Sequence, residues 1–444
     1  MRDMGKFLAV IATWLMVLVA VAQGVPGGPG GSGGSGGPGG QPTLSAQFNL
    51  NDWMTNEPAT DKNHFPDQLP TVEGNTITVV YDKGGSAQVQ IFFRNNNPQQ
   101  AFVGQLIVED ARYVHDTAPL PVPWGSPPPV TIPDTILSAP TVSLNIASLA
   151  TAPATLTISG LPAFVTKGHI QLQMRAEGNF GAQVAGSQSL VPWSGGLTSQ
   201  KVLITYAPPT GAMTPVWTEL AEMSCAMAQG ESVISDINRE LTKGLFFGNI
   251  FTYDLPDGPS FYCYDVGANG VIFNLKLFLA HLTAAPNQGG CKTINTFLGL
   301  LHHSQGLDVV GRRVQCSDIT KSFVTNKVVP IGSDASDDLN YIRLKFAWHF
   351  QLISNGQVAD ASLAYRYDIQ GLSYMNPAYL WNYTGSWQTM INSVIFGLAY
   401  RYHLPSEDST EHHPTYSFDP VKIGTSPGQL IDETYDEYFF VGVF

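Results

Sequence analysis

The stretch FAWHFQLISNGQVADASLAY, residues 346–365, combines a turn signal with one histidine and one aspartate. Asn355-Gly356 is the strongest kind of two-residue turn signal, and alternating apolar residues flank it on both sides, so the pattern predicts a β-hairpin. If these two residues form the turn, Ser354 pairs with Gln357. The same register then places Asp360 opposite Gln351.

The predicted hairpin brings two ionisable side chains to one face. His349 lies two residues from Gln351 on the same side of its strand, so its imidazole is a diagonal neighbour of Asp360, about 7 Å away and within reach of a side-chain hydrogen bond. The other face carries a stripe of apolar residues that we expect to face the core: Leu344, Phe346, Trp348, Phe350 and Leu352. Two interpretations stay open, an exposed His and Asp on a half-buried sheet, or a catalytic pair with a nucleophile elsewhere.

Length and composition limit the class of protein. A chain of 444 residues is long enough for two or three domains. Hydrophobic residues make up 43% and charged residues only 13%, a low charge content that suits an exported β-rich protein. The formal net charge is −13 and Lys and Arg form no cluster, so we expect no nucleic-acid partner.

The N-terminus has the pattern of a signal peptide. Arg2 and Lys6 precede an apolar run, and Ala20 and Ala22 supply small residues for cleavage, which predicts a signal peptide over residues 1–22. An uncleaved anchor is the alternative, and it is the only membrane association that we expect. Either way the protein is predicted to be secreted, periplasmic or at the cell surface. Residues 23–43 are rich in Gly and Pro and read as a disordered linker.

The remaining chain divides by pattern into three parts. Residues 44–209 contain short alternating runs between Pro, Gly and Asn clusters, which predicts an antiparallel β-sandwich. Residues 210–374 begin with helix-like spacing in 216–230, 271–282 and 291–303, and strands follow, which predicts an α+β domain. Residues 375–444 read as an aromatic-rich, loop-like extension packed on that second domain.

The four cysteines are Cys225, Cys263, Cys291 and Cys316. In an exported protein an even number favours disulfides, and two bridges could connect them in three ways. Cys225, in a predicted helix, and Cys263, in a predicted strand, are interpreted as buried or bridged.

Cys291 has the surroundings of a reactive thiol. It follows Gly289-Gly290 and opens a predicted helix, whose N-terminal N–H groups favour a thiolate and can hold a developing oxyanion. We expect this helix to stop at Gly306, with His302 and His303 near its last carbonyl groups, which explains the two histidines without a metal ion.

Cys316 is the alternative nucleophile. It ends the predicted strand 307–315, and the β-branched residues after it, within 317–326, form at best a short helix. A short helix offers a weaker N-terminal site for a thiolate, so Cys291 is the preferred nucleophile.

The order of cysteine, histidine and aspartate resembles that of the transglutaminase-like cysteine peptidase and acyltransferase superfamily, which has a papain-like fold. GGCKTI (289–294) is similar to its nucleophile segment, FAWHF (346–350) supplies the histidine and GQVADA (356–361) the aspartate. The upstream WTELAEMSCAMAQG also looks like a helix of this family, so the resemblance covers about residues 215–370. It implies a Cys291–His349–Asp360 catalytic triad, and Gln288 is the candidate for the family's oxyanion partner.

The predicted function is that of an exported thiol-dependent hydrolase or acyltransferase acting on a protein or peptide. The Cys291 thiolate would attack a peptide or glutamine amide to form a thioester, released to water or to an amine. Hydrolysis is favoured over amine transfer, and neither a cofactor nor a metal ion is expected. The alternative is a catalytically inactive surface, adhesion or structural protein with the same fold and bridged cysteines.

Overall fold

The computed structural model describes about half of the chain. The described residues are 44–47, 53–54, 78–116, 132–181, 190–195, 197–210, 217–248, 250–253, 262–265, 271–275, 277–278, 287–316, 321–332, 342–346, 348–366, 380–382, 395–400, 430–435 and 439–443. The predicted signal peptide and linker, residues 1–43, lie outside them, as does most of the C-terminal extension.

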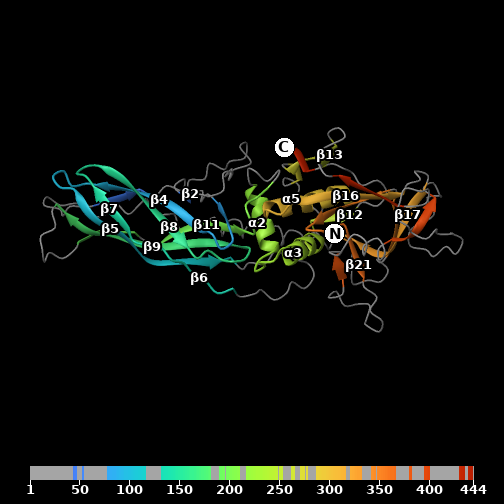
Figure 1. Ribbon diagram of the computed structural model, residues 1–444, viewed down its shortest axis with the longest axis horizontal. Coiled ribbons are helices and arrows are strands. Elements are labelled where there is room, and N and C mark those ends of the chain that lie inside the picture. The colour runs from blue at the N-terminus through green and yellow to red at the C-terminus, as the bar shows by residue number, and fades with distance from the viewer. Residues whose placement is uncertain are drawn as a thin grey trace, which may run out of the picture.

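The N-terminal half is made of two facing sheets (Figure 1, left). The first sheet contains β1 (Leu44–Gln47), β2 (Trp53–Met54), β4 (Ser86–Asn95) and β8 (Thr151–Ser159). The second contains β3 (Val79–Asp82), β5 (Phe102–His115), β6 (Thr135–Ile136), β7 (Val142–Ile146), β9 (Thr166–Phe180), β10 (Leu190–Ser194) and β11 (Thr198–Thr205).

The two sheets share one apolar core, as a sandwich does. Along β4 every second side chain is buried, and Val89, Ile91 and Phe93 are fully covered. They pack with buried side chains of the second sheet, such as Leu172 and Ile204. The predicted sandwich-like arrangement is therefore present, although β3 and β11 pair in parallel rather than antiparallel.

The helices of the described residues lie between the sandwich and the C-terminal strands (Figure 1). The predicted helices are present as α2 (Thr218–Met227) and α5 (Cys291–Ser304), whereas α3 (Ile234–Phe247) was not predicted. The segment 271–282, predicted as a helix, begins as the strand β14 (Val271–Phe273), and only Leu275, Leu277 and Phe278 after it are helical among its described residues. The three residues of this strand are all apolar, and so short a run cannot show whether the helical or the strand period applies.

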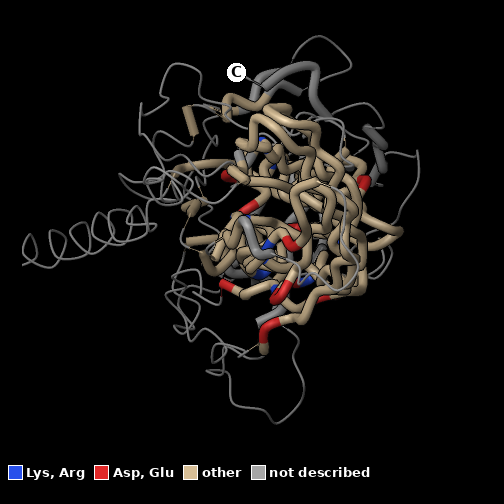
Figure 2. The backbone as a smooth tube through the Cα atoms, turned by 90° about the vertical axis from the view of Figure 1, so that its left-hand side faces the viewer, with Lys and Arg blue, Asp and Glu red and all other residues tan. Residues whose placement is uncertain are grey.

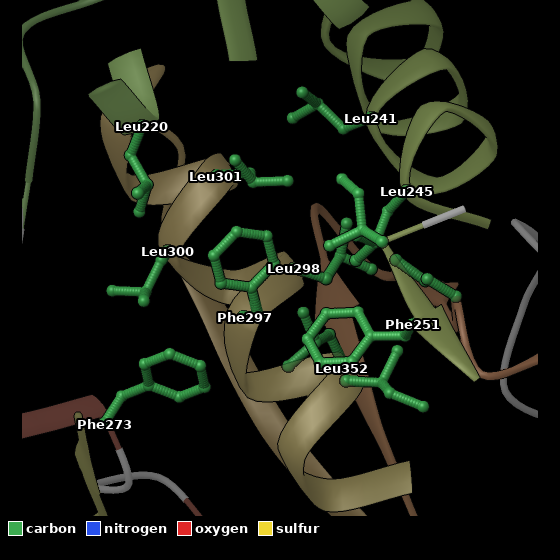
Figure 3. Close-up of a cluster of buried hydrophobic side chains, with 14 of the residues drawn as sticks. Leu220, Leu241, Leu245, Phe251, Phe273, Phe297, Leu298, Leu300, Leu301 and Leu352 are labelled. Atoms are coloured by element: carbon green, nitrogen blue, oxygen red, sulfur yellow. The ribbon is translucent and has the colours of Figure 1, made fainter. Parts of the chain in front are cut away.

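Helix α5 is the centre of the second core. Figure 3 shows Phe297, Leu298 and Leu301 of α5 surrounded by apolar side chains from neighbouring elements. These neighbours are Leu220 of α2, Leu241 and Leu245 of α3, Phe251 of β12 (Phe251–Tyr253), Phe273 of β14 and Leu352 of β19 (Trp348–Ser354). The same core includes Val80, Val165 and Leu203 of the sandwich. One continuous apolar core therefore fixes the position of α5.

Helix α5 ends as predicted. Gly306 has φ +71°, and its N–H donates to the carbonyl of His303 while the N–H of Leu307 donates to that of His302. This pair of bonds is the Schellman motif, which glycine favours because the left-handed conformation strains other residues.

Small sheets complete the C-terminal half. One has the order β20 (Gln357–Ala359), β19, β16 (Val309–Cys316), β24 (Leu430–Tyr435). Another has the order β18 (Ile342–Phe346), β17 (Lys321–Pro330), β21 (Leu363–Arg366), β22 (Leu380–Asn382), with β23 (Ile395–Tyr400) on β17. The others join β12 to β15 (Asn287–Gly289), and β13 (Cys263–Asp265) to β14 and β25 (Phe439–Val443).

Three predictions in this half are corrected. The expected single strand before the turn is two strands, β18 and β19, in different sheets, so its apolar stripe is divided. Much of the segment 317–326 belongs to the strand β17 rather than to a short helix, as its β-branched residues permit. The described parts of the C-terminal extension include four strands, β22 to β25, that pair with β21, β17, β16 and β14 instead of forming loops.

Charged residues are sparse along the described backbone (Figure 2). None of the helices in the described residues combines the length and the apolar character needed to cross a bilayer.

Candidate functional site

Cys291 is the first residue of α5, with Gly290 as its N-cap in an extended conformation. The strand β15 runs directly into this cap, so sheet and helix together fix the thiol at the helix N-terminus. The side chain is 6% exposed and the thiol is free, as is that of Cys225. Cys291 is therefore not bridged.

The hairpin has the predicted register. Ser354 pairs with Gln357 and Leu352 with Ala359, and Asn355 and Gly356 both have positive φ, as a tight hairpin turn requires. The ladder ends at Ala359, and Asp360 follows directly after it. Asp360 lies outside the ladder, so its carboxylate contacts the His349 imidazole directly instead of lying at the diagonal distance that the sequence predicted.

His349 and Asp360 form a buried pair. The imidazole Nε2 lies 2.6 Å from the Asp360 Oδ2 atom, and the two residues are 4% and 6% exposed. Interpreting them as an exposed pair on a half-buried sheet is wrong, because both faces of β19 are covered here: Phe350 lies in the apolar core and Gln351 is fully buried.

The thiol lies beside this pair. The backbone N–H of Phe350, the residue after His349, donates to the Cys291 Sγ atom across 3.4 Å. Burial disfavours a charged imidazole, but the charges of Asp360 and Cys291 and hydrogen bonds with both side chains outweigh it and raise the pKa of His349 to about 10. An imidazolium at neutral pH is the counter-ion that a cysteine thiolate requires.

Asp360 is held as a carboxylate by several donors. Its Oδ1 atom accepts hydrogen bonds from Asn295 Nδ2 (2.9 Å), the Ser362 N–H (2.9 Å) and the Ser362 hydroxyl (2.6 Å). Burial alone would raise the pKa of Asp360, but the charge of His349 and these hydrogen bonds lower it. Sequence reasoning missed Asn295 and Ser362, although the spacing of Asn295 four residues after Cys291 places both on one face of α5.

Tyr253, the last residue of β12, was also missed. This half-buried side chain lies beside Cys291, whose side chain and backbone both influence its pKa. Burial, followed by the charges of Cys291 and Asp360, raises the pKa of Tyr253 well above its usual value, so its hydroxyl stays protonated. Gln288, the predicted oxyanion partner, is exposed on β15. No local sequence signal marks Tyr253, because its contact with Cys291 depends on the parallel pairing of β12 with β15.

The other cysteines are not part of this cluster as far as the structure describes them. Cys225 is fully buried, accepts a hydrogen bond from Gln305 Nε2 at 3.3 Å, and has its pKa raised to about 12, chiefly by burial. Its thiol is therefore inert at neutral pH. Cys316 is the last residue of β16 and Cys263 the first of β13, and the side chains of both lie outside the described part of the chain.

His302 and His303 are structural. Burial lowers the pKa of each to about 4, and His302 Nδ1 lies 2.8 Å from the Leu298 carbonyl while His303 Nδ1 lies 3.1 Å from the Thr210 hydroxyl. Within the described residues, no three His, Cys, Asp or Glu side chains lie close enough to hold a metal ion.

Comparisons with known proteins give only distant likenesses. No family model matches the sequence, and no curated protein matches it. The transglutaminase of red sea bream matches with a TM-score of 0.34 and 10% identity, over 64% of this chain and 49% of that one. The ASH/PapD-like domain of human CEP192 matches with a TM-score of 0.21 and 11% identity, over 39% of this chain and 94% of that one.

A family 123 glycoside hydrolase from Clostridium perfringens matches with a TM-score of 0.18 and 12% identity, over 39% of this chain and 29% of that one. The chain spans about half the length of the transglutaminase that it matches. Likenesses this distant assign neither a family nor an activity.

Proposed function

We propose that this protein is an exported thiol-dependent hydrolase or acyltransferase of the transglutaminase-like type, with Cys291, His349 and Asp360 as its catalytic triad. One observation supports this function above the others. A free thiol at a helix N-terminus contacts an imidazole, and a buried carboxylate 2.6 Å from that imidazole keeps it charged. Such a connected cluster is the arrangement that activates a sulfur nucleophile.

The proposed reaction begins with the thiolate. The Cys291 sulfur attacks the carbonyl carbon of a peptide or glutamine amide and forms a C–S bond, and the electron pair of the carbonyl moves to its oxygen. As the C–N bond then breaks, the His349 imidazolium gives its proton to the leaving amine. A thioester remains on Cys291, and Asp360 keeps the neutral imidazole in the required orientation.

The second half of the reaction reverses these roles. His349 takes a proton from a water molecule or an amine, whose oxygen or nitrogen attacks the thioester carbon, and the C–S bond breaks to restore the thiolate. Hydrolysis is the preferred outcome, because water is always available. The substrate is proposed to be a protein or peptide outside the cytosol, consistent with the predicted signal peptide.

Tyr253 is proposed as the oxyanion donor. Its protonated hydroxyl lies against the sulfur, where the oxygen of a tetrahedral adduct would develop its charge. The N-terminus of α5 adds a favourable partial positive charge at the same place. This assigns the role expected of Gln288 to a residue on the neighbouring strand.

Site-mapped thiol labelling tests the proposal. Iodoacetamide at pH 6.5, followed by mass spectrometry, should label Cys291 in the full chain much faster than any other cysteine, and His349→Ala should slow this labelling at least about tenfold. Cys291→Ser should abolish it, whereas Cys316→Ser should not. Fast labelling at Cys316 that survives Cys291→Ser would identify the alternative nucleophile, and an unchanged rate in His349→Ala would refute the triad.

A further inference from the structure

Asn295 is a fully buried amide whose hydrogen bonds all run to the hairpin. It lies on α5, one turn after Cys291. Its Nδ2 atom donates to the Phe350 carbonyl (2.8 Å) and to Asp360 Oδ1 (2.9 Å), and its Oδ1 atom accepts from the Ala361 N–H (2.9 Å). Both N–H donors are used, so the amide is held in one orientation.

The partners of Asn295 have a specific relation to each other. The β19–β20 ladder pairs Ser354 with Gln357 and Leu352 with Ala359, and the same register would pair Phe350 with Ala361. The side-chain amide of Asn295 lies between these last two residues and bonds the carbonyl of one and the N–H of the other. Asn295 therefore acts as a wedge that continues the hydrogen bonds of the ladder while it holds the two strands apart.

By holding the two strands apart, Asn295 makes room for Cys291, His349 and Asp360 to meet. In a β-strand the N–H and C=O of one residue point to the same side. Asn295 Nδ2 donates to the carbonyl of Phe350, and the N–H of Phe350 donates to Cys291 Sγ. These two side chains, one helical turn apart on α5, therefore bond the backbone groups that a neighbouring strand would otherwise bond. The sulfur is thereby fixed against the residue that follows His349.

The wedge also orients the carboxylate. Asn295 and Ser362 together occupy Asp360 Oδ1, which leaves Oδ2 for His349 at 2.6 Å. A residue needed only for packing at this position would be apolar, as its neighbours Ile294 and Leu298 are. An amide contributes nothing to that core except through its hydrogen bonds.

We propose that Asn295 is a positioning residue, which sets the distance between the strands so that the Cys291 sulfur, the His349 imidazole and the Asp360 carboxylate meet. This inference rests on the proposed function, since it assigns a further residue to the same site. Asn295 acts through Asp360 and Phe350 and does not itself touch the substrate.

The test is the pH profile of Cys291 alkylation in the full chain, measured with iodoacetamide from pH 4 to pH 9. In the unmodified protein the rate should stay high towards low pH, because the His349 imidazolium, oriented by Asp360, lies beside the sulfur and favours the thiolate. Asn295→Leu should lower the rate at pH 6 about tenfold, the effect of one lost hydrogen bond to a charged group. The acid limb of the profile, where the alkylation rate falls as pH is lowered, should also move to higher pH in this variant.

Ser304→Ala is the matched control. Ser304 is a fully buried polar residue of the same helix, about two and a half turns further on, and it bonds Ser224 at 2.6 Å. Both variants should lower the melting temperature, but only Asn295→Leu should change the pH profile. If Asn295→Leu melts earlier and keeps the profile of the unmodified protein, Asn295 is only a structural residue and the inference is wrong.

A second variant serves if Asn295→Leu does not fold. Asn295→Asp has the same shape and keeps the acceptor for Ala361, but it places a second carboxylate beside Asp360, so the acid limb should move to higher pH. An unmoved limb would overturn the inference. Alkylation needs no substrate, so a shifted profile in a protein without amide-cleaving activity would support the role of Asn295 and refute the proposed function.

Discussion

His349 Nε2 and Asp360 Oδ2 lie 2.6 Å apart in a place that is closed to solvent, with the two residues 4% and 6% exposed. A charge pair in such a place is sensitive to the loss of one partner, because the remaining charge is buried without compensation. The pair therefore contributes to the stability of the fold, and its imidazole is also the proposed acid–base partner of the Cys291 thiol.

Asp360→Asn should show both effects. We expect the free energy of unfolding to fall by about 3–5 kcal/mol in urea titrations at pH 7, because a charged His349 would be left without its carboxylate. Alkylation of Cys291 at pH 6 should slow as well. The control is Asp110→Asn, which removes an exposed ion pair with Arg112 and should change stability by about 0.5 kcal/mol or less. Equal effects of the two substitutions would contradict the buried pair.

The pH dependence of stability should have two descending sides. The pKa of His349 is raised to about 10, so the folded state holds this proton more tightly than the unfolded state, and stability is lost as pH rises from about 6.5 through 10. The pKa values of His302 and His303 are lowered to about 4, so stability is also lost as pH falls from about 6.5 towards 4.

Urea titrations across pH 4–10 measure these two sides. Each buried group should contribute a slope of up to about 1.4 kcal/mol per pH unit within its window. His349→Gln should flatten the alkaline side only, and His303→Gln should reduce the acid side only. If His349→Gln leaves the alkaline slope unchanged, the imidazole is not the group that titrates there.

The hairpin could be predicted from sequence because its signals are local. Asn355 and Gly356 fix the turn, and the turn fixes the register of everything near it, so the proximity of His349 and Asp360 follows from a stretch of 20 residues. The start of α5 at Cys291 follows from the glycines before it and the apolar spacing after it.

The rest of the site could not be predicted because it depends on long-range packing. Asn295 reaches residues more than 50 positions away, and Tyr253 reaches Cys291 only because β12 and β15 pair in parallel. The same holds for β24, which joins β16 from the far end of the chain. In each case the partner is chosen by the arrangement of the sheets, and no spacing in the sequence encodes it.

Tyr253→Phe separates activation of the thiol from stabilisation of the oxyanion. The substitution removes one hydroxyl beside Cys291 and keeps the ring. Alkylation should remain within about threefold of the unmodified rate, since it develops no oxyanion, whereas hydrolysis of p-nitrophenyl acetate by Cys291 should fall by about 10²-fold. Tyr262→Phe is the control, because its hydroxyl bonds Asn287 Oδ1 at 2.6 Å instead. Unchanged ester hydrolysis in Tyr253→Phe would contradict the assigned role.

The side chain of Gln351, two residues from His349, lowers the stability of the folded protein, and a substitution should remove this cost. Its side chain is fully buried, and neither Oε1 nor Nε2 has a hydrogen-bond partner in the part of the chain that the structure describes. An unsatisfied buried amide costs about 1–3 kcal/mol, and methionine has a similar length without this cost. Gln351→Met should therefore raise the free energy of unfolding by about 1 kcal/mol in urea titrations.

Gln200→Met provides the comparison. Gln200 is also a buried glutamine on a strand, but its Nε2 atom donates to the Lys201 carbonyl at 3.0 Å. Its replacement should lower the free energy of unfolding, because a carbonyl then loses its donor. If Gln351→Met is as destabilising as Gln200→Met, the amide of Gln351 has a partner in solution, and a buried water molecule beside His349 would be the first to look for.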